Sequence, residues 1–156
     1  MSLMVRVDDR LVHGQVVVGW GRAMRLRRIV LVDDAISGSD WEQELYRMGV
    51  PDGMEVEFTS VAGAADGFAR WDADADRTMV LVGDVETLGR LSAVAPVTRV
   101  TLGGIHQAAG RRERLPFVFL SDAEAAALAA LAARGITITA QAVPTTAPVP
   151  LAEVLR

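Results

Sequence analysis

The chain has 156 residues, which suits one domain of ordinary size and is too short for two. Apolar residues make up 51% and charged residues 23%, a balance that excludes wholesale disorder. The formal net charge of −4 disfavours nucleic acid as a partner, and the lack of cysteine excludes disulfides and thiolate metal sites.

Short apolar runs and alternating segments predict the strands. In chain order they are Leu3–Val7, Arg28–Val32, Met54–Phe58, Thr78–Val82, Arg99–Leu102, Phe117–Leu120 and Ile136–Val143. The unbroken apolar run of Arg28–Val32 suits a strand buried on both faces, whereas strict alternation places Met54–Phe58 near a sheet edge. Such an edge leaves room for self-association, so a homo-oligomer is compatible with the sequence.

Apolar residues at helical spacing predict the helices between these strands. In chain order they cover Val16–Met24, Trp41–Met48, Val61–Trp71, Val85–Ala93 and Ser121–Arg134. Capping boxes at Ser39–Glu42 and Ser121–Glu124 predict two of the helix starts. Trp41, Leu45 and Met48 form one helical stripe, and we expect Trp41, like Trp71, to lie in the core.

Charged segments lie between these elements. Asp72–Asp76 reads as an exposed acidic loop, and Arg111–Arg114 as a solvated run. No apolar run reaches the ~18 residues of a membrane span, and the N-terminus lacks the apolar core of a signal peptide. We therefore expect a cytoplasmic protein without membrane insertion. Met1–Leu3, which precede a second methionine, are left out of the functional prediction.

The repeated strand–helix order predicts a single three-layer α/β/α domain over residues 1–156, with a mostly parallel central sheet and an antiparallel strand near its edge. Ligands of such sheets bind beyond the carboxyl ends of the strands. The loops at that end are Asp8–Gly14, Asp33–Ser39, Gly83–Glu86 and Gly103–Gln107.

The first of these loops carries the densest chemistry. Besides two carboxylates it holds Arg10 and His13, one of only two histidines in the chain. A neutral imidazole is a competent nucleophile near pH 7, and the fork of donors on arginine suits phosphoryl oxygens. Gly14 and Gln15 open the following helix, whose first amides favour an anion. The loop thus contains the parts of a phosphohistidine site.

Other residues are candidates for the same site. Asp8 or Asp9 is placed to orient the His13 ring or to shape the loop, and Arg6 lies on the strand behind as a secondary phosphate ligand. The pair Gly103–Gly104 permits positive φ and close backbone approach, so it is either an anion nest or a plain turn. His106, just after this pair, is either near the phosphate or an ordinary loop histidine.

Two alternatives follow from the same residues. A metal-dependent hydrolase would use Asp8, Asp9, Asp33 and a histidine. A binding module would keep the fold without phosphotransfer, in which case His13 is a structural or merely exposed histidine.

The segment Arg6–Val16 closely resembles the signature of the mannose/fructose/sorbose-type IIB component of the bacterial phosphoenolpyruvate-dependent sugar phosphotransferase system (PTS). The resemblance covers nearly the whole chain. Further segments that resemble the family are Arg28–Asp34, Gly49–Gly53, Val100–Ile105 and Ser121–Ile136.

This resemblance implies a role for the loop. His13 would accept phosphate from a phosphohistidine of a IIA component, on the ring nitrogen nearer the backbone, and pass it to a sugar held by membrane IIC and IID components. Arg10 would contact the phosphoryl group, and neither a metal nor an organic cofactor would be needed. A regulatory phosphoacceptor that signals to a target protein, without a transporter, is the alternative within the same chemistry.

Overall fold

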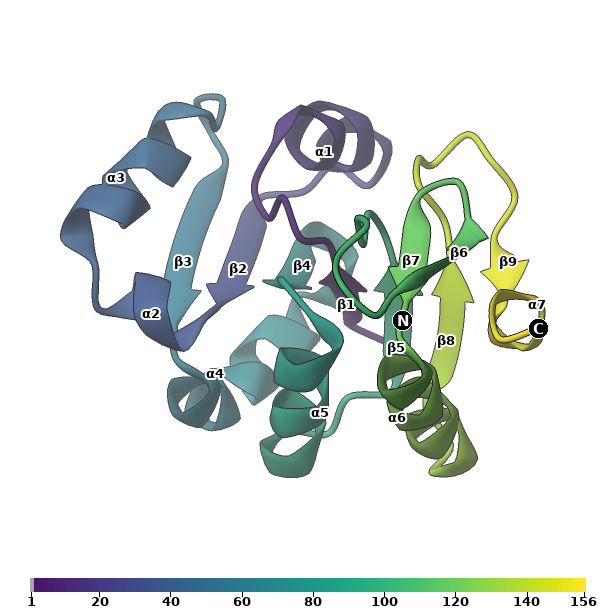
Figure 1. The fold of residues 1–156 in the computed structure, drawn as a ribbon. Helices are drawn as coiled ribbons and strands as arrows, with labels where there is room; N and C mark the ends of the chain where they lie inside the picture. Colours follow the sequence, from purple (N-terminus) through teal and green to yellow (C-terminus); the bar gives the residue numbers. More distant parts are fainter. Residues whose placement is uncertain (1) are drawn as a thin grey trace.

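The structure is built on a seven-stranded sheet with helices on both faces (Figure 1). It is a computed structural model that describes residues 2–156, so Met1 lies outside it. From one edge to the other the strands are β3 (Glu55–Thr59), β2 (Arg28–Val32), β4 (Thr78–Val82), β1 (Met4–Val7), β5 (Arg99–Leu102), β8 (Thr137–Ala140) and β9 (Val149–Pro150). All neighbours pair in parallel except β8 and β9. The predicted fold, with an antiparallel strand at the edge, is confirmed.

Helices cover the two faces in separate groups (Figure 1). One face carries η1 (Gln15–Trp20), a π-helical segment that continues into α1 (Gly21–Ala23), together with α2 (Asp34–Ser37) and α3 (Asp40–Met48). The other carries α4 (Val61–Ala73), α5 (Val85–Val94) and α6 (Asp122–Ala133). The remaining elements are η2 (Ala75–Arg77), α7 (Leu151–Val154) and a separate hairpin of β6 (Arg112–Leu115) and β7 (Val118–Leu120).

The central strands are apolar throughout because their side chains alternate between two buried cores. In β4, Val80 and Val82 join the core beneath α4, α5 and α6, whereas Met79 and Leu81 join the core beneath η1. Strand β1 follows the same alternation with one exception. Arg6 occupies a position of β1 that points toward the η1 side, and it is fully buried. A charged residue at such a position has to be explained by its contacts.

Several expectations about individual segments are wrong. Ser39 begins α3 but its side chain makes no capping hydrogen bond, whereas the capping box of Ser121 and Glu124 is confirmed. Trp71 is buried as predicted, but Trp41 is 69% exposed. The stripe of α3 faces solvent because other residues of this helix, such as Tyr46 against Phe58, make its contacts with the sheet.

Two charged segments are more ordered than expected. Arg112–Leu115 is strand β6, because it pairs with β7, and so Arg111–Arg114 is not merely a solvated run. The first residues of the region 72–76 belong to the end of α4, and the last ones belong to η2. Ala75 is buried against the core, so the region is not an exposed loop. None of the helices within residues 2–156 is both long and apolar enough to cross a bilayer.

Gly67 of α4 provides a test of the packing. A Cβ at this position would lie 2.5 Å from Cζ2 of the buried Trp71 ring. We expect Gly67→Ala to lower the free energy of unfolding by roughly 1–3 kcal/mol, although alanine is the better helix former. Gly89→Ala in α5, where a Cβ meets nothing within 4 Å, should instead raise it by up to about 1 kcal/mol. Urea titration of both variants checks this, and equal effects would contradict the packing described for Trp71.

Candidate functional site

The loop after β1 begins at the carboxyl edge of the sheet, with strands on both sides. Its first two amides are fixed by these neighbours: Asp8 N–H donates to the carbonyl of Val82 over 3.0 Å, and Asp9 N–H donates to that of Gly104 over 2.8 Å. Leu11 N–H then donates to the carbonyl of Asp8, and Leu11 adopts a left-handed φ of 58° while its side chain is buried. A leucine with positive φ is strained, and here burial compensates for the strain. The loop therefore has a fixed shape.

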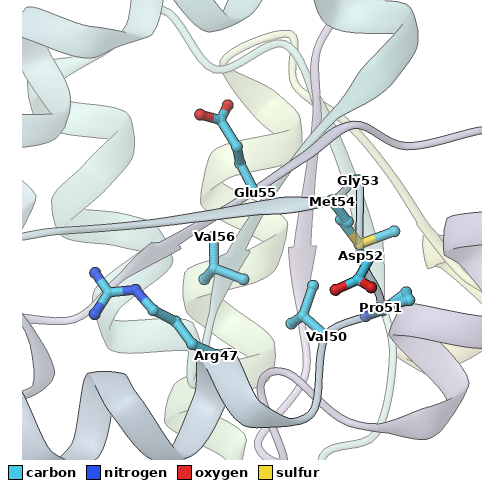
Figure 2. Close-up of a pocket in the computed structure, with 8 residues that line it drawn as sticks. All are labelled: Arg47, Val50, Pro51, Asp52, Gly53, Met54, Glu55 and Val56. Carbon is cyan, nitrogen blue, oxygen red and sulfur yellow. The ribbon is translucent and has the colours of Figure 1, made fainter.

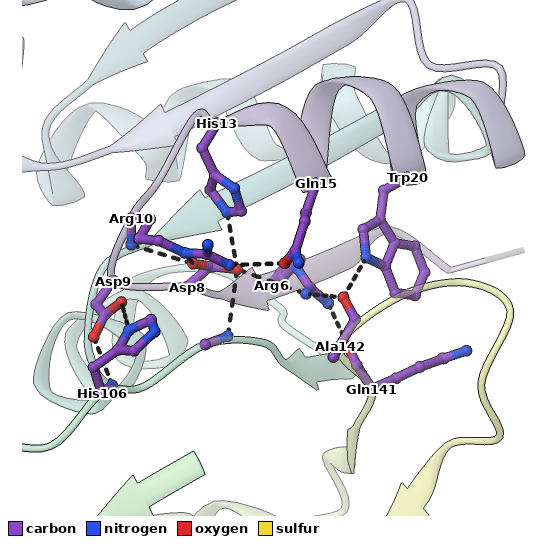
Figure 3. Close-up of polar contacts among 11 residues, drawn as sticks. Arg6, Asp8, Asp9, Arg10, His13, Gln15, Trp20, His106, Gln141 and Ala142 are labelled. Atoms are coloured by element: carbon purple, nitrogen blue, oxygen red, sulfur yellow. Dashed lines mark hydrogen bonds and ion pairs between the residues drawn. The ribbon is translucent and has the colours of Figure 1, made fainter. Parts of the chain in front are cut away.

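Asp8 is the centre of the site (Figure 3). Its carboxylate is fully buried and lies 3.2 Å from His13 Nε2, 3.6 Å from Arg6 Nη2 and 3.8 Å from Arg10 Nε. The amides of Arg10 and Gly104 donate to it over 3.2 and 3.3 Å. Burial alone would raise the pKa of Asp8, but the contacts with His13, Arg10 and Arg6 outweigh it and lower that pKa below its usual value. Asp8 is thus a carboxylate at neutral pH.

Arg6 lies beneath Asp8 with no exposed surface. Its Nη1 and Nη2 donate to the carbonyls of Gln141 and Ala142 over 2.9 Å each, and its guanidinium lies 4.7 Å from the ring centre of Trp20. Burial lowers the pKa of Arg6 to about 10, which still leaves it charged at neutral pH. The predicted direct contact between Arg6 and a phosphate does not fit this geometry, because the Arg6 side chain has no exposed surface and both terminal nitrogens donate to carbonyls.

Gly103 and Gly104 pass close to these charges. A Cβ on Gly103 would lie 2.5 Å from Arg6 Nη2 and 2.7 Å from Asp8 Oδ2, so the predicted close approach is present. Neither glycine has positive φ, and both amides are occupied: Gly103 donates to the carbonyl of Val7, and Gly104 donates to Asp8. An anion nest is therefore wrong for this pair. Its role is to leave room for the pair of Arg6 and Asp8.

His13 lies above Asp8 and is partly open to solvent, with 16% of its side chain exposed. Its buried Nε2 has no partner that meets strict hydrogen-bond geometry, and Asp8 Oδ2 is the one carboxylate oxygen at ion-pair distance within residues 2–156. The sequence left open which of two neighbouring aspartates contacts the ring, and the structure shows that it is Asp8. The other ring nitrogen, Nδ1, makes no contact with a carboxylate in the described residues.

Arg10 and Gln15 lie beside the ring on the open side of the loop (Figure 3). Arg10 is 43% exposed, and its Nη2 donates to Gln15 Oε1 over 2.7 Å. Gln15 is the first residue of η1 and follows Gly14, which is exposed. Among the arginines near Asp8, Arg10 is the one with surface available to a ligand.

Asp9 contacts the other histidine of the chain, His106. Its Oδ1 lies 2.7 Å from His106 Nδ1, and its Oδ2 accepts from the His106 amide over 2.7 Å. Arg111 donates to the carbonyl of His106 and makes a two-pronged pair with Glu124 at the start of α6. Asp9 therefore ties the loop to the segment after β5 and does not contact His13. No spacing in the sequence signals this network, because its members come from three separate segments.

The ligand set of the metal-dependent alternative does not come together. No group of three or more His, Asp or Glu side chains suited to a metal ion occurs within residues 2–156. Asp33, its third proposed carboxylate, instead caps α2 by accepting from the amide of Ile36 over 2.8 Å.

Comparison with known proteins points to one group. A family model described as "PTS system sorbose subfamily IIB component" matches residues 2–156. N-acetylgalactosamine-specific phosphotransferase enzyme IIB component 2 of Escherichia coli (strain K12) is 28% identical over 98% of both chains. The mannose-specific EIIAB component of the same strain is 27% identical over 91% of this chain and 44% of its own length. The crystal structure of manxB from Thermoanaerobacter tengcongensis has a TM-score of 0.86 at 24% identity, over 99% of this chain and 97% of the other.

Gly103→Ala tests the buried charges without removing one. The added methyl would separate Arg6 from Asp8, so we expect the free energy of unfolding to fall by roughly 1–3 kcal/mol at neutral pH. Because the pKa of Asp8 is lowered, its contribution to stability is present above the unfolded value near ~3.9 and is lost as pH falls through the folded value. The difference from the wild type should therefore shrink in acid. Thermal unfolding across pH measures it; Gly38→Ala, where the nearest atom is 3.8 Å away, serves as the control.

Proposed function

This chain belongs to the family of PTS sorbose-subfamily IIB components, which are sugar phosphotransferases, and we propose that it carries the phosphoryl group on His13. Membership confirms the family that the segment Arg6–Val16 resembles. The observation that carries the proposal for His13 is the contact of its Nε2 with the buried carboxylate of Asp8.

That contact supports Nδ1 as the ring nitrogen that reacts. A carboxylate 3.2 Å from Nε2 stabilises the tautomer with the proton on Nε2, which leaves the lone pair on Nδ1. Nδ1 is the ring nitrogen nearer the backbone, the one that the family resemblance implies. After phosphorylation the ring keeps its Nε2 proton, and Asp8 stabilises the positive charge that the ring then carries.

Two transfers follow from this arrangement. In the first, Nδ1 of His13 attacks the phosphorus of a IIA phosphohistidine, the donor P–N bond breaks, and the donor ring regains its lone pair. In the second, a sugar hydroxyl attacks the phosphorus on His13, the P–Nδ1 bond breaks, and the hydroxyl proton is released. Both steps move charge onto three phosphoryl oxygens, so their rates depend on nearby cations and donors.

Arg10 is the proposed electrostatic partner. Its guanidinium is half-exposed, charged and held beside the ring by Gln15 and Asp8. The amides of Gly14 and Gln15 at the start of η1 are further proposed donors. Arg6 acts indirectly by keeping Asp8 ionised and in place, and Asp9 acts by anchoring the loop. A single exposed arginine holds the phosphoryl group without trapping it.

The proposed partners are a phosphorylated IIA component and membrane IIC and IID components that present the sugar, with the exchange taking place in the cytoplasm. The name of the EIIAB relative joins a IIA and a IIB component in one protein, which supports a IIA component as the donor. The partly open ring of His13 is compatible with successive contacts to a donor and to an acceptor.

His13→Ala should abolish labelling from a ³²P-phosphorylated IIA protein while the circular dichroism spectrum stays unchanged, because the ring lies at the edge of the core. His106→Ala is the matched control and should still accept one phosphate. Gel autoradiography at alkaline pH, which spares the N–P bond, measures both. Retention of the label by His13→Ala would mean that the acceptor is misassigned.

Arg10→Ala should slow phosphate uptake about 10²–10³-fold, the usual effect of removing one donor that stabilises developing charge. Arg10→Lys keeps the charge but loses the fork of donors, so an intermediate rate is expected. Rapid-quench kinetics at fixed donor concentration give the rates. An alanine variant as fast as the wild type would exclude Arg10 from the transfer.

A further inference from the structure

Helix α3 presents an apolar face that nothing in the described chain covers. Trp41, Leu45 and Met48 are 69%, 57% and 76% exposed, and their spacing places them on one side of the helix. The helix is held by its other side, where Tyr46 contacts Phe58 and Gln43 donates to two carbonyls of α2. A helix with no fully buried residue and a large apolar stripe is a typical contact surface for another protein.

Two hollows that share Gly49 lie along this helix, and we call them together the groove. At one end it is lined by Val12, Trp41 and Leu45, and at the other by Val18, Met48 and Met54, with Gly49 common to both ends. Figure 2 shows the turn that follows α3, where Val50, Pro51 and Met54 lie, and these three residues also line the far end of the groove. Val18, on the opposite wall, is 50% exposed. The groove is therefore mainly apolar, with Glu42 at its near end and Arg22 at its far end.

We propose that this groove is the docking surface for the phosphodonor protein, the phosphorylated IIA component. The inference rests on the proposed function of His13. Val12, which lines the near end of the groove, is the residue before His13. A donor that brings its phosphorus to Nδ1 covers the surface around that ring. Even a small transient interface of about 600 Å² per partner has a radius of roughly 14 Å. The stripe on α3 is only ~10 Å long, so an interface of this size can cover both His13 and the stripe.

The charges along the groove fit such a donor. Arg10, which complements a phosphoryl group, is two residues before Val12 in the same loop. Helix α3 carries three acidic residues, Asp40, Glu42 and Glu44, and one basic residue, Arg47, which pairs with Glu44 over 3.8 Å. The helix thus has a net charge of 1 − 3 = −2. The complementary partner surface has a phosphohistidine, an apolar ridge beside it and basic side chains along the rim.

A second copy of this chain fits the same groove less well. A stable homodimer across the groove would cover the approach to His13, whereas the relay needs that ring open to two partners in turn. A donor that binds briefly and leaves does not have this conflict. Few apolar anchors at the edge of the ring suit an interface that must form and dissociate in every cycle.

The test compares two phosphate donors on the full chain. Leu45→Ser/Met48→Ser and Trp41→Ala remove exposed anchors, and Val94→Ser, 46% exposed on α5 of the other face, is the matched control. With ³²P-labelled IIA protein, the second-order rate of His13 phosphorylation should fall roughly 10- to 100-fold in the α3 variants and stay unchanged in the control. With phosphoramidate, a donor too small to dock, all variants should react like the wild type.

The outcomes separate the docking surface from the chemistry. Equal rates for wild type and α3 variants with phospho-IIA would overturn the docking surface while leaving His13 as the carrier. Slowing only in the second transfer, to sugar in IIC/IID vesicles, would also overturn it and assign the groove to the acceptor. If the wild type takes phosphate from phosphoramidate and not from any IIA protein, a IIA component is not the donor, and the proposed docking surface is wrong as well. If neither donor labels His13, the proposed function itself fails.

A charge reversal adds a second readout. Glu42→Lys, at the near end of the groove, should slow uptake from phospho-IIA and reverse its dependence on salt, because a basic rim would then be repelled. Glu86→Lys on α5 is the charge-matched control. An identical salt dependence for Glu42→Lys and the wild type would contradict the basic rim.

Discussion

The site depends on one buried carboxylate. Asp8 contacts two arginines, one histidine and two amides from a position with no exposed surface. Burying a charge is costly unless it is paired and hydrogen-bonded, and removing one partner of a buried pair typically costs about 3–5 kcal/mol. Three features around Asp8 meet this requirement. Arg6 lies inside the core, Gly103 stands where a Cβ would collide with the ion pair, and the strained Leu11 closes the loop.

This arrangement separates stability from reactivity. Arg6 gives its donors to two carbonyls and its charge to Asp8, so it holds the site without being available to a ligand. Arg10 has fewer internal contacts and more exposed surface. On the proposed function, a phosphoryl group on His13 would meet one exposed cation, Arg10, above the buried pair of Arg6 and Asp8. A carrier needs this balance, because a phosphate held by two buried arginines would be bound too tightly to pass on.

Much of the fold was predictable because strand and helix periods are local. The buried strands β2, β4 and β5 have the predicted ends, since each is a short, mainly apolar segment followed by a charged residue or glycine. The presence of Arg10 and His13 in one loop was predictable for the same reason. The pairing of Asp9 with His106 and the burial of Arg6 against the 141–142 segment were not, because they join residues 97 and 135 positions apart. Sequence spacing cannot say which of two adjacent aspartates turns toward a histidine.

The stripe of α3 shows a further limit of periodicity. Apolar residues at positions 41, 45 and 48 indicate that one face of a helix requires an apolar neighbour, and the simplest assumption is that the chain itself supplies it. Here the sheet beneath η1 and α3 is already filled by side chains such as Val16, Trp20 and Leu31, and Tyr46 takes the remaining place. An exposed tryptophan and an exposed methionine beside an apolar groove are not needed for the packing of a monomer, since polar residues at these positions would be more soluble. The same pattern that predicts a core within one chain is equally consistent with a contact between two, and the proximity of Val12 to His13 favours the second.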